Sequence, residues 1–198
     1  MIYGFIGNDY QRIRIKLITV TKSKEANIYT VYGKSMVKDN ICDFYGTITI
    51  SSIRKFKTIS NGVDSMYKNA GIKGQFVILG DYLFSESKIQ KHSGIFKGTF
   101  QTDFYINKSN VIKYDDIDIQ ADGFSNNQFV GSWSDYNEKL TKKCNWGDFR
   151  IPESGDLDIG AGDFSPNEKY LKNGWQGLNS EIKLNQNVHS IKKGQWWQ

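Results

Sequence analysis

The chain has 198 residues, a net charge of +5 and an aromatic content of 14%. This length fits one domain that buries a core without disulfide or metal staples. The positive charge is nearly all lysine, whereas proteins that read bases and phosphates favour the arginine fork, so nucleic acid is not an expected partner. No apolar run approaches the about 20 residues that a membrane-spanning helix needs, so no membrane span is expected.

Alternating apolar and polar residues predict seven strands and an eighth near the C-terminus. In chain order the seven span about residues 11–20, 28–37, 41–53, 74–86, 94–106, 111–121 and 128–133; the eighth spans 181–184 or 188–192. Short polar turns join most of them, which is typical of an antiparallel meander. Such an all-β meander closes as an up-and-down barrel or folds as a two-layer sandwich, and the sequence leaves both open.

One short pattern recurs in these strands: a glycine lies two residues from a large apolar neighbour on either side. The four glycines are Gly46, Gly80, Gly98 and Gly131. Because side chains alternate along a strand, each glycine shares a face with its large neighbours. A glycine inside a strand has no side chain to pack, so its repetition predicts tightly coiled strands or aromatic rings that lie over the gap.

The C-terminal part differs in composition, since residues 134–180 are rich in Gly, Asn and Asp and show little alternation of apolar and polar residues. We therefore expect a single domain, 1–198, in which a strand meander over about 1–134 carries an irregular segment over 135–198. One short helix is predicted at about 166–173. Ser165 is a suitable N-cap, Pro166 fits the first helical position, and Glu168 completes a capping box.

Gly-Ser-Trp at 131–133 and the glycine–aromatic strands resemble the calycin group of β-barrels, the lipocalins and avidins. In lipocalins the Gly-x-Trp lies near the N-terminus, whereas here it lies two thirds along the chain. The resemblance therefore implies a barrel and no ligand residues. The block over residues 126–167 is similar to one in uncharacterised bacterial proteins, which implies a bacterial protein and no activity to transfer.

All five tryptophans lie between Trp133 and the C-terminus. Trp133 is in phase with Phe129 and Gly131, so we expect it in the core. Trp146 and Trp175 fall in segments rich in Gly and Asn, where an aromatic side chain is either covered or available to a partner.

The candidate ligand-binding residues are these two tryptophans with three polar neighbours: Trp146, Trp175, Asn145, Asp148 and Arg150. An apolar platform rimmed by planar hydrogen-bonding groups suits sugars and flat or amphipathic ligands. We expect at least one indole to be partly exposed near Asp148 or Arg150. Packing in the core is the alternative for both.

Three carboxylates, Asp156, Asp158 and Asp163, would supply oxygen ligands to calcium, although their spacing does not match an EF-hand. The alternative is a short strand with outward aspartates. No other metal site and no cofactor is expected, because nucleotide and zinc motifs are missing from the sequence. Cys42 and Cys144 are the only cysteines; they are either buried thiols or, in an exported protein, a disulfide.

Together these features favour a non-enzymatic protein that binds a small amphipathic ligand or glycan through its aromatic loop region. The first alternative is a protein-interaction module, such as an inhibitor or immunity-type factor. The second is a hydrolase that uses the carboxylates of residues 148–163. We expect a soluble monomer or weak homodimer, cytoplasmic as the sequence is written and exported if a leader has been removed.

Overall fold

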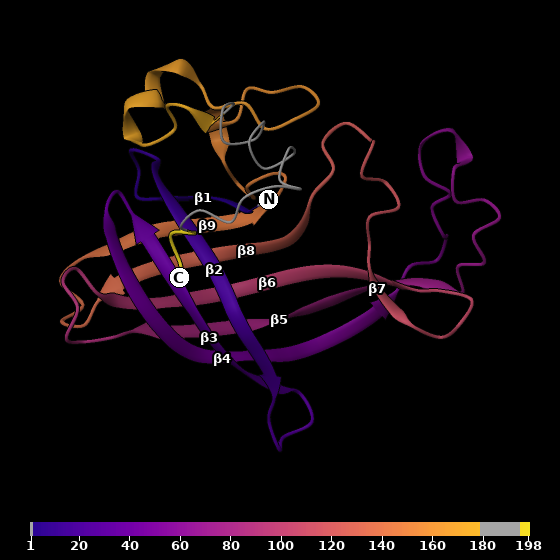
Figure 1. Ribbon diagram of the computed structural model, residues 1–198, viewed down its shortest axis with the longest axis horizontal. Coiled ribbons are helices and arrows are strands. Elements are labelled where there is room, and N and C mark those ends of the chain that lie inside the picture. The colour runs from indigo at the N-terminus through magenta and orange to yellow at the C-terminus, as the bar shows by residue number, and fades with distance from the viewer. Residues whose placement is uncertain (1, 179–194) are drawn as a thin grey trace.

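The computed structural model describes residues 2–178 and 195–198, and its main feature is a closed antiparallel β-barrel (Figure 1). Eight strands pair in the ring order β1-β2-β3-β4-β5-β6-β8-β9. The ring closes because β9 pairs with β1, and β5 pairs with β6. A short ninth strand, β7, extends the sheet along the end of β6. The all-β antiparallel prediction is confirmed, and the meander forms a barrel rather than a sandwich.

The five strands predicted between residues 11 and 106 agree with the structure to within two residues at each end, whereas the strand over residues 2–6 was not predicted. The strands are β1 (Ile2–Ile6), β2 (Gln11–Lys22), β3 (Ile28–Val37), β4 (Asn40–Lys55), β5 (Gly74–Glu86), β6 (Gly94–Ile106), β7 (Ile112–Tyr114), β8 (Asn126–Asp135) and β9 (Thr141–Asp148). Three short 3₁₀ helices are η1 (Val63–Ser65), η2 (Gly155–Leu157) and η3 (Glu168–Asn173). No helix in the part of the chain that the structure describes is long and apolar enough to cross a membrane.

Two strand predictions need correction. The strand expected over 111–121 is only the three-residue β7, because tight turns follow, in which Ile119 N bonds Asp116 O at 3.1 Å. Strand β9 lies in the segment expected to be irregular, so the barrel extends to Asp148. The strand expected at 181–184 or 188–192 lies outside the described residues.

The barrel interior is filled by large apolar side chains, as the two-residue alternation predicts. Phe44, Phe84, Phe96 and Trp146 are all at most 1% exposed. Cys42 and Cys144 are both buried free thiols. Strands this tightly wound leave no room for side chains where they approach most closely.

The repeated glycines lie at those close approaches. Gly98 and Gly131 face each other in register on β6 and β8. A Cβ added to Gly98 would collide with the carbonyl oxygen of Val130, and one added to Gly80 would meet the Phe100 ring at 2.6 Å. Both predicted roles, close backbone approach and an aromatic ring over the gap, are therefore present in the barrel.

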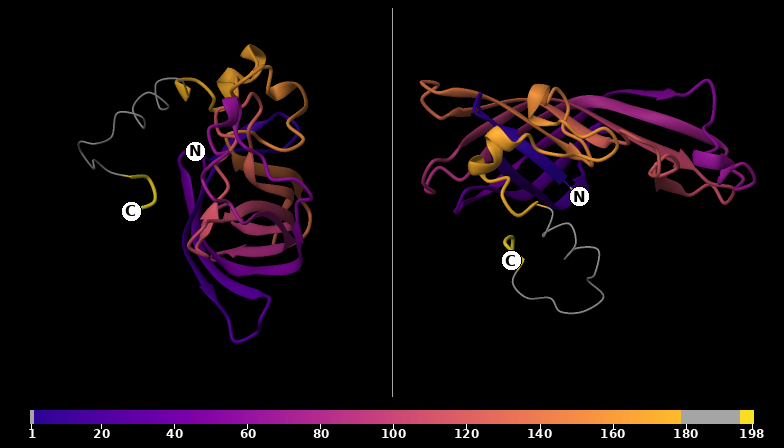
Figure 2. Two further views of the ribbon diagram at one scale, coloured as in Figure 1. Left: turned by 90° about the vertical axis from the view of Figure 1, so that its right-hand side faces the viewer. Right: turned by 90° about the horizontal axis from the view of Figure 1, so that it is seen from above.

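Residues 149–178 cover the outside of β1 (Figures 1 and 2). A second apolar cluster forms between them and this strand. Tyr3 and Phe5 point outward from β1 into this cluster, which contains Ile151, Leu157, Phe164, Trp175 and Leu178. The barrel and the segment thus bury one core inside the ring and one against its outer wall.

The predicted short helix is present, but as the 3₁₀ helix η3 and with a different cap. Its N-cap is Asn167, whose side chain accepts a hydrogen bond from Lys169 N at 3.2 Å. The expected cap, Ser165, and the expected first residue, Pro166, are extended, because Pro166 forms a β-bridge with Asp158. The helix ends at Gly174, which adopts the left-handed conformation of a C-cap.

Candidate functional site

Both candidate tryptophans are buried, so the expectation that one of them is exposed is wrong. Trp146 is 1% exposed inside the barrel and stacks on Phe129 with ring centroids 5.0 Å apart. Trp175, also 1% exposed, lies in the outer cluster and donates its indole N–H to Tyr10 O at 2.8 Å. Trp146 points inward because residues 141–148 form a strand instead of a loop.

The polar candidates are engaged by the protein's own groups. Asn145 is fully buried and bridges Gly131 N at 3.1 Å and Pro152 O at 2.9 Å. Asp148 accepts hydrogen bonds from the Tyr114 hydroxyl at 3.0 Å and from Asn127 Nδ2 at 2.6 Å. These contacts tie β9 to β8 and to the end of β7. Ligand binding by these residues stays a prediction.

Arg150 organises the loop that follows β9. Its Nη1 contacts Asp158 Oδ2 at 2.5 Å and Gly160 O at 2.9 Å, while Nη2 donates to the carbonyl oxygens of Ala161 and Gly162. Both charged side chains are largely buried, with exposed fractions of 16% for Arg150 and 7% for Asp158. The guanidinium therefore satisfies the backbone carbonyl oxygens of this glycine-rich loop.

The aspartates considered for calcium are divided among different partners. Asp158 pairs with Arg150, whereas Asp156 contacts Lys169 Nζ and the Tyr170 hydroxyl. Within the ranges 2–178 and 195–198, no group of three or more His, Cys, Asp or Glu side chains is placed to hold a metal ion.

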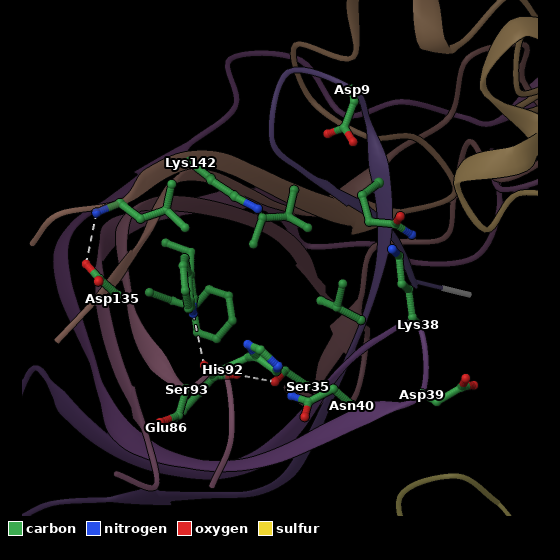
Figure 3. Close-up of a pocket in the computed structure, with 16 residues that line it drawn as sticks. Asp9, Ser35, Lys38, Asp39, Asn40, Glu86, His92, Ser93, Asp135 and Lys142 are labelled. Carbon is green, nitrogen blue, oxygen red and sulfur yellow. Dashed lines mark hydrogen bonds between the residues drawn. The ribbon is translucent and has the colours of Figure 1, made fainter. Parts of the chain in front are cut away.

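A pocket of about 660 Å³ opens at the barrel end where four hairpin turns meet (Figure 3). The turns join β1 to β2, β3 to β4, β5 to β6, and β8 to β9. Apolar side chains from the strands form its wall, among them Ile6, Val37, Phe96 and Trp133. Charged and polar side chains from the turns surround its opening.

Glu86, the last residue of β5, lines this pocket and is only 5% exposed. Its Oε1 accepts from the Ser35 hydroxyl (Figure 3). Its Oε2 accepts from Trp133 Nε1 at 2.9 Å and from Gly94 N at 2.8 Å. Burial raises the pKa of Glu86 above its ordinary value, and the three hydrogen bonds offset part of that shift.

The pocket is more negative than the protein that contains it. Four carboxylates line it, from Asp9, Asp39, Glu86 and Asp135, against two lysines and one histidine, Lys38, Lys142 and His92. The whole chain carries a net charge of +5. None of the salt bridges among residues 2–178 includes Glu86, so within that range no basic side chain lies at contact distance from this carboxylate.

Sequence reasoning missed this pocket because its residues come from separate hairpins and form no motif. One signal was present. Glu86 continues the inward-facing series of Tyr82 and Phe84 at a two-residue spacing, so a carboxylate occupies a position where an apolar residue is expected. Trp133, expected in the core, is 8% exposed and packs there as predicted, but it also lines the pocket.

Comparisons with models of known protein families, with curated proteins and with solved structures found no match to this chain.

Proposed function

We propose that the protein binds a small amphipathic ligand in the pocket at the hairpin end of the barrel, without converting it chemically. The observation that carries the proposal is the pocket itself: about 660 Å³, with an apolar wall and a polar opening. Sites for small molecules have volumes of about 300–1,000 Å³ and this combination of linings. The ligand's apolar part would contact Trp133 and Val37, and its polar part would lie among the charged turns.

The barrel architecture supports the same proposal. An eight-stranded antiparallel barrel that is open at one end is the arrangement that the resemblance to calycins implies. We propose on this ground that the chain is related to that group. Ligand binding is proposed from the shape and lining of the pocket, whether or not the chain is related to calycins.

A concave site favours a small ligand over the alternative of a protein partner. Protein interfaces bury about 800 Å² on each partner and are usually broad surfaces, whereas this pocket is enclosed by strand ends and turns. The carboxylates considered for a hydrolase do not line it. Asp148, Asp156 and Asp158 instead hold the protein's own side chains.

The test uses the indole N–H signals of the tryptophans in a ¹⁵N-labelled protein, assigned with single Trp→Phe variants. Octan-1-ol is titrated as a neutral amphipathic probe. The Trp133 signal should shift in a saturable way, because its indole lines the pocket. The Trp175 signal should stay in place, because its N–H bonds Tyr10 O in the outer cluster.

A variant that fills the pocket gives the control. Val37→Trp places a large side chain in the pocket wall and should abolish the Trp133 shift. Val20→Trp makes the same change at a position of β2 that is 52% exposed and does not line the pocket, so it should bind as the wild type does. Equal binding by both folded variants, or no Trp133 shift in the wild type, would refute the proposal.

A further inference from the structure

We infer that this pocket selects ligands that carry a protonated amine on an apolar body, and that Glu86 is the counter-charge for the amine. This inference rests on the proposed function and adds the chemical class of the ligand. It follows from how the charge of Glu86 is compensated, from the acceptor site that its carboxylate leaves free, and from the side chains that surround it.

Glu86 is a buried acid that has no basic partner among the residues that the structure describes. Buried charges in proteins are paired, coordinate a metal or become neutral. Among the described residues, the side chains whose pKa the charge of Glu86 raises are Cys42, Tyr136 and Cys144. These are two thiols and a phenol, all uncharged at neutral pH. Within residues 2–178, protein groups therefore supply hydrogen bonds to Glu86 and form no ion pair with it.

The lysines of the pocket do not take this role. Lys38 and Lys142 line the same pocket, but both are exposed to solvent and neither forms a salt bridge with Glu86. Exposed ammonium groups are hydrated and screened, so they compensate a desolvated carboxylate poorly. A ligand that enters the pocket carries its cation to the buried carboxylate itself.

The hydrogen bonds around Glu86 hold the carboxylate in place and leave one of its acceptor sites unused. An ionised carboxylate offers about four acceptor sites. Three are used, by Ser35 Oγ, Gly94 N and Trp133 Nε1, and these donors come from three different parts of the barrel wall. The remaining acceptor site is available to an ammonium N–H. All three donors favour the ionised form, which is the form that binds a cation.

The surroundings suit the rest of such a ligand. The indole that bonds Glu86 belongs to Trp133, which lines the pocket, and an aromatic face beside a carboxylate attracts a cation further. Ile6, Val37 and Phe96 provide apolar wall for the ligand's body. Four carboxylates against two lysines and one histidine make the opening attractive to cations, although the chain as a whole is positive.

The competing interpretation is that Glu86 only ties β3, β5 and β8 together. Glu86→Gln separates the two, because the amide keeps nearly the same shape. Its oxygen accepts from Trp133 and Gly94, its N–H₂ donates to the Ser35 hydroxyl, and only the charge is lost. Glu25→Gln, in the exposed turn between β2 and β3 at the opposite end, is the matched control.

The experiment compares three probes with one C8 chain: octylamine, octan-1-ol and octanoate at pH 7, followed by the Trp133 indole signal and by calorimetry. Wild type and Glu25→Gln should bind octylamine at least about tenfold more tightly than octan-1-ol, and octanoate most weakly. Glu86→Gln should bind octylamine and octan-1-ol within about threefold of each other, with its octan-1-ol affinity unchanged.

Each other outcome has a defined meaning. Equal affinity of the wild type for octylamine and octan-1-ol would overturn the inference but leave the proposed function in place. No Trp133 shift with any probe would overturn both. An amine preference that persists in a folded Glu86→Gln protein would show that another group binds the cation. If Glu86→Gln does not fold, the three-probe comparison on the wild type still decides whether the pocket selects amines.

Discussion

Two regions of this protein combine a tryptophan with charged side chains. They differ in whether the charged side chain is paired within the described residues and in whether the residues line a pocket. Around Trp146 and Arg150 the indole is 1% exposed, and the guanidinium is paired with Asp158 and three loop carbonyls. At the hairpin end, Trp133 and Glu86 line a pocket of about 660 Å³, and the carboxylate has hydrogen bonds but no cation.

We propose that the way charge is compensated, and not the residue types present, distinguishes the structural site around Arg150 from the ligand site proposed around Glu86. Arg150 is a charged group that is paired and hydrogen-bonded by other groups of the chain, so replacing it should affect folding. Glu86 has no counter-charge among the described residues, so replacing it should affect binding and spare folding. The four predictions that follow test this division, from the largest expected effect to the smallest.

Trp146→Ala should lower the free energy of unfolding by about 3–5 kcal/mol, because the indole fills the middle of the barrel core. Urea denaturation measures the loss. Tyr45→Ala removes an aromatic side chain that is 65% exposed and should change stability by less than about 1 kcal/mol. A Trp146→Ala protein with wild-type stability would mean that this indole is not part of the core.

Arg150→Met should cost about 3 kcal/mol, near the lower end of the range for breaking a buried ion pair, because both partners keep some exposure. The change leaves the Asp158 carboxylate and three loop carbonyl oxygens without their donor. Lys22→Met, at an exposed position of β2, is the control and should be nearly neutral. Adding Asp158→Asn to Arg150→Met should recover part of the loss; no recovery would argue against the pair.

Asn167→Ala should lower stability by about 1 kcal/mol, because it removes the cap of η3. Ser165→Ala should cost less than about 0.5 kcal/mol, since Ser165 contributes its backbone N–H to Asp158 rather than a side-chain cap. Thermal melts of both variants measure the order of the two effects. The reverse order would place the helix start where the sequence pattern predicts it.

Glu86→Gln should have the smallest effect on stability, and its sign should depend on pH. Burial raises the pKa of Glu86 in the folded state above its ordinary value of 4.5. The folded state therefore holds this proton to higher pH than the unfolded state, and the wild type loses stability as pH rises from about 4.5 through the folded-state pKa. Melting curves at several pH values should show Glu86→Gln gaining stability relative to the wild type over that interval. A constant difference would contradict the raised pKa.

Much of the barrel was predictable from alternation and turns. The bounds of β3, β5 and β6 follow directly from the sequence, because long runs of alternating residues end at polar turns. Strand β9 was not predictable in this way. Its glycine and asparagine content favours a loop, and it becomes a strand because β1 and β8 pair with it on both sides.

The candidate site was the harder part to predict. Trp146 looks available when Asn145 and Gly147 are read as loop residues, and it is buried once they belong to a strand. The pocket depends on side chains such as Ser35, Glu86 and Trp133, which only the closure of the barrel brings together. A carboxylate in phase with buried aromatic residues was the one local sign of it.

The most direct measurement of the central claim is the pKa of Glu86 itself, followed by the ¹³C chemical shift of its carboxyl carbon with and without saturating ligand. If octylamine places its ammonium group against this carboxylate, the bound cation stabilises the ionised form, and the pKa of Glu86 must fall on binding. Octan-1-ol should leave that pKa higher than octylamine does. A pKa of Glu86 that is the same with octylamine and with octan-1-ol would contradict the account.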